Sequence, residues 1–284
     1  MDRLHADRAS ARNEQAALRV LSTDLDGTLI PLPEHGENSR DLKQLADEIA
    51  THRLTLVYVT GRHFESARGA MAEHGLPEPD WLICDVGTSI FRRSAVEGYI
   101  EAQTYLHHQT AILAGYAIEQ LQQRLSSIDA LTLQEPEKQG RFKLSYYADA
   151  KRLDELASEI RRRLDETKAP FTLIESVDPF NGDGLLDLLP RGVSKAYALR
   201  WWAEQTDRVR ESIVFAGDSG NDLAALSAGY CAIVVGNADR SLAARATSEH
   251  LEQGWLDRLY LAQAHATSGV LEGWRWFRNA QRKG

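Results

Sequence analysis

Residues 18–28 read Leu-Arg-Val-Leu-Ser-Thr-Asp-Leu-Asp-Gly-Thr, an apolar segment that runs into two acids and a glycine. In an extended strand, residues i and i+2 point to the same face, so the carboxylates of Asp24 and Asp26 can converge on one small volume. Gly27 frees the backbone to turn directly after them. Because two adjacent carboxylates repel each other, the pattern predicts a partner that holds them together.

A second acidic cluster, Asp-Ser-Gly-Asn-Asp at 218–222, follows another apolar segment at 213–216. The carboxyl ends of parallel strands line one crevice of an open sheet, so we expect the two clusters to meet there. Concentrated negative charge on strand-end loops indicates a site for a divalent cation.

Strand-like segments alternate with helical patterns through much of the chain. Near-continuous apolar strands of this kind are typical of a parallel sheet with helices on both faces, and hence of the α/β class. A helix is expected over 39–51, with Ser39 as its N-cap, and another over 63–74. The expected parallel strands lie at 18–24, 54–60, 81–86, 213–218 and 232–235.

The pattern changes between about residues 91 and 189, where strands are grouped around two helices. This grouping predicts a small α+β unit with an antiparallel sheet, inserted because the parallel pattern resumes after it. Its helices are expected over 108–126 and 150–167, its strands over 131–134, 142–148, 171–175 and 185–189, and a tight turn at 179–184.

The chain is therefore expected to have a core in two parts, 18–91 and 190–284, and an inserted unit at 92–189. Residues 1–17 are polar and are expected to form an extension outside the folded part.

Composition excludes several classes of function. The 284 residues are 43% hydrophobic and carry a formal net charge of −8, which argues against broad electrostatic binding to nucleic acid or anionic lipid. No apolar run reaches the roughly 20 residues that span a bilayer. Cys84 and Cys231 lie in apolar segments without metal-ligand spacing, so we expect core residues and a cytoplasmic protein.

Four strand-end elements together supply the groups that phosphoryl transfer needs. Asp24 would attack phosphorus and form an aspartyl phosphate, and Asp26 would protonate the leaving alcohol and then activate water. Thr60 and the amide of Gly61 would donate hydrogen bonds to phosphate oxygens. Lys195 would add positive charge at the start of a helix.

A phosphate among several carboxylates needs a cation. Two unit charges ~4 Å apart interact by about 4 kcal/mol at an effective dielectric of about 20, so the acids alone would expel an anion. Magnesium fits best because it prefers oxygen ligands and bridges carboxylates to phosphate. The expected ligands are Asp24, the carbonyl of Asp26, and Asp218, with Asp222 standing behind them.

Each motif also has a structural explanation. Asp24 and Asp26 could be turn and cap residues, Thr60-Gly61 commonly ends a strand, and Lys195 could be a solvated lysine. The functional interpretation depends on all of the motifs occurring in this order, each after an apolar strand.

These residues resemble the four motifs of the haloacid dehalogenase superfamily. The matching segments are 24–28, 60–62, Lys195 and 217–222, and the insertion resembles the cap of the type II B branch. Residues 142–146, 187–190 and 266–272 look like those of sucrose-phosphate phosphatase and its relatives. The resemblance covers about 18–275 and implies a Rossmann-like, doubly wound core.

The resemblance also implies roles for individual residues. Asn221 would lie at the phosphate and Arg62 at the substrate. From the cap, Lys143, Ser145 and Tyr146 would hold sugar hydroxyls, with Asn181 and Asp183 as further candidates. Phe142, Leu144 and Tyr146 also alternate as one face of a strand, so Lys143 and Ser145 could be ordinary solvent-side residues.

The sequence thus predicts a magnesium-dependent phosphatase acting on a sugar or disaccharide phosphate, foremost sucrose 6-phosphate. Mannosylfructose phosphate and glucosylglycerol phosphate are alternative substrates, and a sugar phosphomutase or a binding protein without turnover are alternative classes. The ion-pump branch is disfavoured, because it has Thr where this chain has Asp26. A monomer is compatible with the sequence, which does not fix the oligomeric state.

Overall fold

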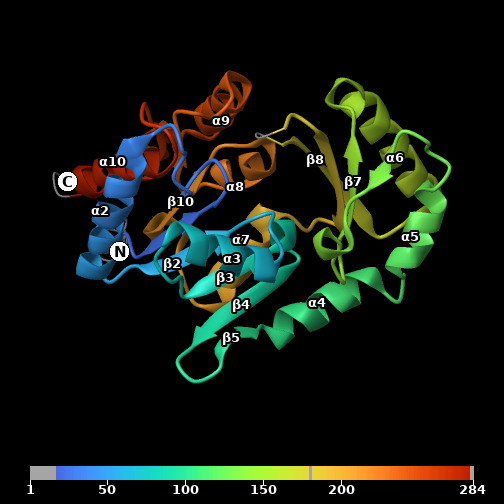
Figure 1. Ribbon diagram of the computed structural model, residues 1–284, viewed down its shortest axis with the longest axis horizontal. Helices are drawn as coiled ribbons and strands as arrows, with labels where there is room; N and C mark the ends of the chain where they lie inside the picture. Colours follow the sequence, from blue (N-terminus) through green and yellow to red (C-terminus); the bar gives the residue numbers. More distant parts are fainter. Residues whose placement is uncertain (1–16, 179–180, 282–284) are drawn as a thin grey trace, which may run out of the picture.

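A computed structural model describes residues 17–178 and 181–281 of the chain. Two β-sheets organise these residues, one of eight strands and one of four (Figure 1). The strands of the larger sheet are β1 Val20–Thr23, β2 Thr55–Val59, β3 Trp81–Cys84, β4 Ser89–Ser94, β5 Gly98–Glu101, β10 Ile213–Gly217, β11 Cys231–Val234 and β12 Leu259–Leu261.

The larger sheet has the order β12-β11-β10-β1-β2-β3-β4-β5, with β4 and β5 antiparallel at one edge and all other neighbours parallel. From β1 the chain builds outward through β2 and β3, and later returns to add β10 on the opposite side of β1. The direction of winding therefore reverses between β1 and β10, which is where open α/β sheets bind their ligands.

Helices cover both faces of the larger sheet. One face packs against α2 Gly36–His52, α3 Phe64–His74 and α10 Ala266–Gln281, and the other against α7 Lys195–Gln205, α8 Leu223–Leu226 and α9 Arg240–Gln253. The central strands are fully buried, as the apolar segments predict. The predicted α/β class with a doubly wound sheet is confirmed.

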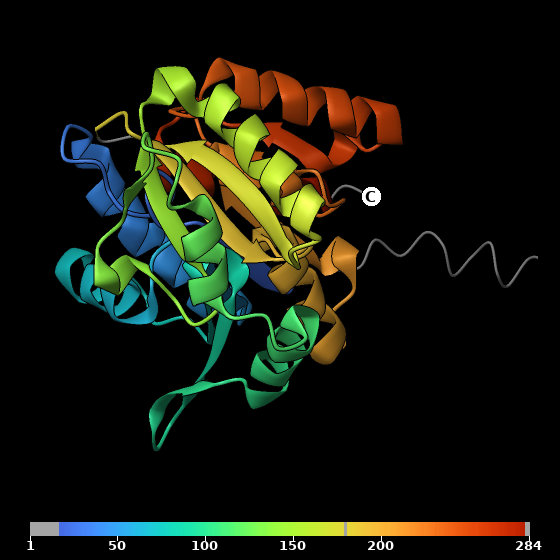
Figure 2. The same cartoon turned by 90° about the vertical axis from the view of Figure 1, so that its right-hand side faces the viewer.

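The smaller sheet is antiparallel and has the order β6-β7-β9-β8. Figure 2 shows this sheet face-on, with a helix lying across it. Its strands and the helices of this part of the chain are β6 Thr132–Leu133, β7 Leu144–Ala148, β8 Phe171–Val177, β9 Gly184–Pro190, α4 Gln103–Leu113, α5 Ile118–Leu125 and α6 Leu153–Thr167.

Short 3-10 turns complete the described elements. They are η1 Asp85–Gly87, η2 Pro136–Lys138, η3 Ala150–Arg152, η4 Arg210–Ser212, η5 Gly220–Asp222 and η6 Leu256–Arg258. Of these, η1 directly follows β3, and η5 begins three residues after the end of β10, so both lie at the carboxyl ends of parallel strands.

Two details of the sequence prediction are wrong. The single helix expected over 108–126 is broken, because α4 ends at Leu113 and the chain then passes through Ala114 and Gly115 with φ of 49° and 85°. A left-handed residue of this kind ends a helix. The helix expected from Ser39 starts earlier, at Gly36, with His35 at the N-cap position, so Ser39 lies inside α2.

The proposed division of the chain at residues 91 and 189 stays a prediction. The larger sheet continues through β4 and β5 to Glu101, past the first of these positions. In the turn expected at 179–184, residues 179 and 180 lie outside the described part of the chain, as does the expected extension except for Ala17.

Among the helices of the described ranges, none combines the length and the apolar composition that crossing a bilayer requires. Both cysteines are free thiols. Cys84 is fully buried in the core, and Cys231, which is half-buried, packs against the same hydrophobic core.

Candidate active site

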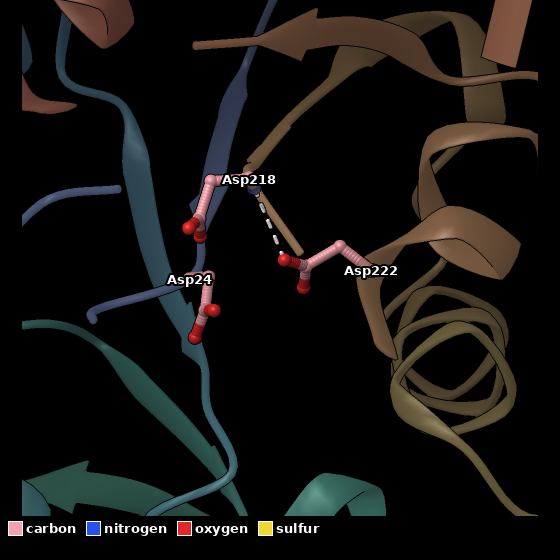
Figure 3. Close-up of side chains that lie close together, drawn as sticks. All are labelled: Asp24, Asp218 and Asp222. Carbon is pink, nitrogen blue, oxygen red and sulfur yellow. Dashed lines mark hydrogen bonds between the residues drawn. The ribbon is translucent and has the colours of Figure 1, made fainter. Parts of the chain in front are cut away.

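Asp24 and Asp218 follow the two neighbouring central strands. Asp24 comes directly after β1 and Asp218 directly after β10, and the amide of Asp24 donates to the carbonyl of Ala216 across the strand pair at 3.0 Å. Both side chains are buried, with 4% and 6% exposure. Figure 3 shows that their carboxylates approach each other from the two strand ends, with Asp222 beside them.

Asp222 is held by the turn that contains it. Its Oδ2 accepts hydrogen bonds from the amides of Asp218 and Ser219 at 3.2 and 3.1 Å, and from the Ser219 hydroxyl at 3.2 Å. Its Oδ1 lies 2.8 Å from the ammonium of Lys195. These contacts occupy both oxygens, and the expected place of Asp222 behind the metal ligands stays a prediction.

Lys195 is the buried counter-charge of the acids. It is the first residue of α7, whose N-cap Ser194 accepts a hydrogen bond from the Tyr197 amide. The Lys195 side chain has 0% exposure, and its Nζ lies 2.9 Å from Asp24 Oδ2 and 2.8 Å from Asp222 Oδ1. A single ammonium thus compensates two of the three buried carboxylates.

The glycine and threonine of the first motif fix Asp218. Gly27 has φ of 70°, and a Cβ at this position would lie 2.3 Å from Asp218 Oδ2. The Thr28 hydroxyl donates to Asp218 Oδ1 at 2.7 Å. The loop after β1 therefore fixes the position of the Asp218 carboxylate. A side chain at position 27 would collide with that carboxylate.

Asp26 pairs with the second motif. Arg62 donates two hydrogen bonds to its carboxylate, from Nε at 2.7 Å and from Nη2 at 2.6 Å. The Arg62 amide in turn donates to the Thr60 hydroxyl at 3.1 Å, and Thr60 is fully buried at the end of β2. The bidentate pair raises the pKa of Arg62 above its ordinary value.

Burial and mutual repulsion shape the acidity of the cluster. Burial raises the pKa of Asp24 well above its ordinary value against the opposing charge of Lys195, and Asp222 and Asp218 raise it further. The pKa of Asp218 rises to about 7, first through burial and then through Asp222. Burial acts to lower the pKa of Lys195, but Asp222 and Asp24 outweigh it and raise that pKa.

The donor set suits a hard divalent cation. One carboxylate oxygen from each of Asp24, Asp218 and Asp222 lies within 4.8 Å of the others, and all three residues are buried. One lysine cannot neutralise three such acids, and oxygen donors without His or Cys are the set that Mg²⁺ prefers. The residues present therefore fit the magnesium ion that the sequence implies.

A cavity of about 440 Å³ lies between the two sheets and opens onto the acids. Several predicted site residues line it, whereas Thr60, Lys195 and Asp222 lie buried behind its wall. The predicted residues that line the cavity are Asp24, Asp26, Gly61, Arg62, Lys143, Asp218 and Asn221. Its volume is in the range of small-molecule sites.

The other predicted sugar-binding residues lie elsewhere. Ser145 is fully buried on β7 and donates to Asp187 on β9, 2.5 Å away. Tyr146 is buried in the hydrophobic core of the smaller sheet. Asn181 and Asp183 are exposed, hydrogen-bond to each other, and are absent from the cavity lining among the described residues. Their roles toward a sugar stay predictions.

Several lining and supporting residues were not identified from the sequence. Asp187 lines the cavity beside Ser145; it was recognised only as part of the family-like stretch 187–190 and was given no role at the site. Gln134 also lines it, from the end of a segment that looked only like a strand. Asn237 bridges the carbonyl of Gly27 and the amide of Ala266, both at 2.7 Å, and had no signal in the sequence.

Comparison with known proteins finds a family model, relatives and solved structures that each match most of the chain. A family model described as sucrose-6F-phosphate phosphohydrolase matches residues 17–278. A putative HAD-like hydrolase of Nitrosococcus oceani is 35% identical over 267 residues, covering 89% of this chain and 70% of that protein. Mannosylfructose-phosphate phosphatase of Agrobacterium fabrum is 28% identical over 91% of this chain and 96% of its own length.

The similarity extends to a solved structure. The sucrose-phosphatase of Synechocystis, determined in complex with sucrose and phosphate, superposes with a TM-score of 0.74 and 26% identity. The match covers 92% of this chain and 98% of that one, so it includes both sheets.

Proposed function

This chain belongs to the sucrose-6F-phosphate phosphohydrolase family of haloacid dehalogenase-type phosphatases, and from that premise we propose that it hydrolyses a disaccharide phosphate with Mg²⁺, foremost sucrose 6-phosphate. The observation that carries the proposal is the buried cluster of Asp24, Asp218 and Asp222 around Lys195, open to a cavity between the two sheets. Figure 3 gives the arrangement of the three acids.

In this proposal Asp24 is the nucleophile. Its carboxylate oxygen forms a bond to phosphorus while the bond from phosphorus to the sugar oxygen breaks. Lys195, 2.9 Å from Asp24 Oδ2, favours the ionised carboxylate against the effect of burial. Gly61 lines the same cavity, and its amide would donate to the phosphate oxygens.

Asp26 is the proposed acid and base. It gives a proton to the leaving sugar oxygen, and then takes a proton from the water that attacks the phosphoryl group on Asp24. This releases inorganic phosphate and restores the Asp24 carboxylate. In the structure both oxygens of the Asp26 carboxylate accept hydrogen bonds from Arg62, so this ion pair must open before Asp26 can carry and transfer a proton.

Asp24, Asp218 and the carbonyl of Asp26 would hold the magnesium ion, with Asp222 and Thr28 orienting Asp218. When bound, the ion supplies the positive charge that lets a phosphate approach these acids.

The segment 92–189 is proposed to act as a cap that recognises the sugar. Ser176 and Asp187 of its sheet, and Gln134 directly after β6, line the same cavity as the acids and offer acceptors and donors for hydroxyl groups. Remote hydroxyl contacts of this kind align an ester for in-line attack.

A second substrate has support from one observation. The Agrobacterium relative named mannosylfructose-phosphate phosphatase matches over almost its entire length, so mannosylfructose phosphate is the alternative. A phosphomutase would use the same pair of acids but would return a phosphosugar.

The test is a phosphate-release screen with Mg²⁺ across sucrose 6-phosphate, mannosylfructose phosphate, glucosylglycerol phosphate and hexose phosphates. We expect release of inorganic phosphate, fastest from a disaccharide phosphate, and its loss in EDTA. Conversion to an isomeric phosphosugar would support a mutase instead. Absence of any turnover with Mg²⁺ would leave a binding protein as the remaining class.

A further inference from the structure

The turn that follows β3 has an unusual backbone. Asp85, Val86 and Gly87 have φ of 53°, 58° and 103°, so two residues with side chains precede the glycine in the left-handed region. For a β-branched residue such as Val86 this conformation is a genuine outlier. Such strain persists only where the surroundings impose it, and it concentrates at functional sites.

This turn contacts both of the segments by which the chain passes from one sheet to the other. The Tyr105 hydroxyl, on α4, donates to the Gly87 carbonyl at 2.6 Å. On the returning segment, a Cβ on Gly87 would lie 2.4 Å from the Ser194 carbonyl, next to Lys195. Val86 packs with Leu189 and Val193 of the same segment. The turn is therefore wedged between both crossings.

Asp85 also reaches the smaller sheet directly. Its Oδ1 lies 3.2 Å from the ammonium of Lys143, the residue before β7, and the two side chains have only 13% and 4% exposure. Asp85 Oδ2 accepts a hydrogen bond from Ser89 at 3.1 Å. Oδ1 accepts no hydrogen bond from the described part of the chain, so the Lys143 charge is what compensates it.

This ion pair stands in the wall of the active-site cavity. Lys143 and Val86 line the same cavity as Asp24 and Asp218. The pair therefore joins the larger sheet to the smaller one at the edge of the proposed reaction centre. Release of the product requires the two sheets to separate. An ion pair suits a contact that must open in this way, because each charged partner is hydrated again when the pair breaks.

We propose that Asp85 and Lys143 form a latch that holds the smaller sheet closed over the carboxylates. Asp85 is then a positioning residue, and Lys143 acts through the latch and not as a ligand of the sugar. The consequence for turnover rests on the proposed phosphatase function, whereas the closure itself does not.

The test is a double-mutant cycle of Asp85→Asn, Lys143→Gln and the double variant. Asn tolerates the left-handed backbone at position 85, so the first change removes charge without adding strain. Glu166→Gln is the matched control, because Glu166 forms an exposed ion pair with Arg162 on α6, away from the cavity.

Small-angle X-ray scattering of each protein, with Mg²⁺ and without substrate, measures closure independently of catalysis. We expect a larger radius of gyration for both single variants, no further increase for the double variant, and the wild-type value for Glu166→Gln. Unchanged scattering in both single variants would overturn the latch. If one variant fails to fold by circular dichroism, the other still decides the question.

Kinetics with sucrose 6-phosphate then measure the consequence. We expect kcat/KM to fall about tenfold in each single variant if about one molecule in ten stays closed, and by the same factor in the double variant. If Lys143→Gln lowers kcat/KM and Asp85→Asn does not, or if their effects multiply, Lys143 contacts the substrate and the proposal is wrong. Wild-type protein that releases no phosphate from this ester or from p-nitrophenyl phosphate would instead count against the proposed function.

Discussion

At the scale of single residues, Lys195 is the positive charge that compensates two of the buried carboxylates. Removing it would leave Asp24 and Asp222 buried without a counter-charge, a change that typically destabilises a fold by about 3–5 kcal/mol. A lysine at the start of a helix looks solvent-exposed in the sequence, and only the assembled structure places it at 0% exposure. The motif identified the residue, but its double pairing could not be predicted.

We predict that Asp24→Asn lowers kcat by a factor on the order of 10³ or more, because the amide is a poor nucleophile toward phosphorus. The fold should persist, since the oxygen of the new side-chain amide can still accept the hydrogen bond that the Leu25 amide donates to Asp24 Oδ1 at 2.8 Å. Phosphate release and circular dichroism measure the two effects. Asp154→Asn on the exposed face of α6 is the control, and near-wild-type activity of Asp24→Asn would exclude Asp24 as nucleophile.

We predict that Mg²⁺ raises the melting temperature of the protein, because it relieves repulsion among Asp24, Asp218 and Asp222. At a hundred times its Kd, a ligand that binds only the folded state stabilises by about 2.7 kcal/mol. Differential scanning fluorimetry with and without Mg²⁺, at ionic strength matched with NaCl, measures the shift. An equal shift in Asp218→Ala would show that the ion binds elsewhere.

At the scale of elements, α2 and α10 are tied by charge. Glu48 on α2 pairs with Arg275 at 3.2 Å and with Arg278, both on α10, and with His52 at 3.3 Å. Burial acts to raise the pKa of Glu48, but the Arg275 hydrogen bond and the charges of Arg278 and Arg275 outweigh it and lower that pKa below 4.5. The folded state thus favours ionised Glu48.

This arrangement gives a pH-dependent prediction. A carboxyl with a lowered pKa stabilises the fold above its unfolded value of about 4.5 and loses that effect as the pH falls through the folded value. We expect Glu48→Gln to cost about 0.5–1 kcal/mol at pH 7, and markedly less at pH 3. Urea unfolding at both pH values measures it, with Glu166→Gln as an exposed control. A loss of equal size at both pH values would contradict the electrostatic explanation.

Elements with strong apolar periodicity were predictable, and their ends less so. The strands β1, β2 and β10 appear where the sequence predicts them, because apolar residues fill most positions of a strand that is buried on both faces. The helix expected over 108–126 failed at Ala114 and Gly115. Gly115 was visible in the sequence, but apolar residues on both sides continued the helical period across it.

At the scale of the whole molecule, the sequence predicted which strand ends meet but not how the two sheets are placed relative to each other. The two acidic clusters converge because β1 and β10 are neighbours. This convergence was predictable, because the carboxyl ends of parallel strands meet at one edge of the sheet. The pairing of Asp85 with Lys143 depends on the relative placement of the two sheets. No local pattern encodes that placement, so the sequence offered Lys143 only as a sugar-binding or a solvent-side residue.

The central strand pair has a consequence for biosynthesis. The Ser22 hydroxyl donates to the Val214 carbonyl, 192 positions later in the chain, so β1 can pair with β2 early but with β10 only after most of the polypeptide has left the ribosome. The antiparallel sheet between them, β6 to β9, pairs over much shorter separations and can form first. A nascent chain would therefore carry the folded smaller sheet before Asp24 and Asp218 can come together, and the proposed hydrolysis could begin only after β10 has been synthesised.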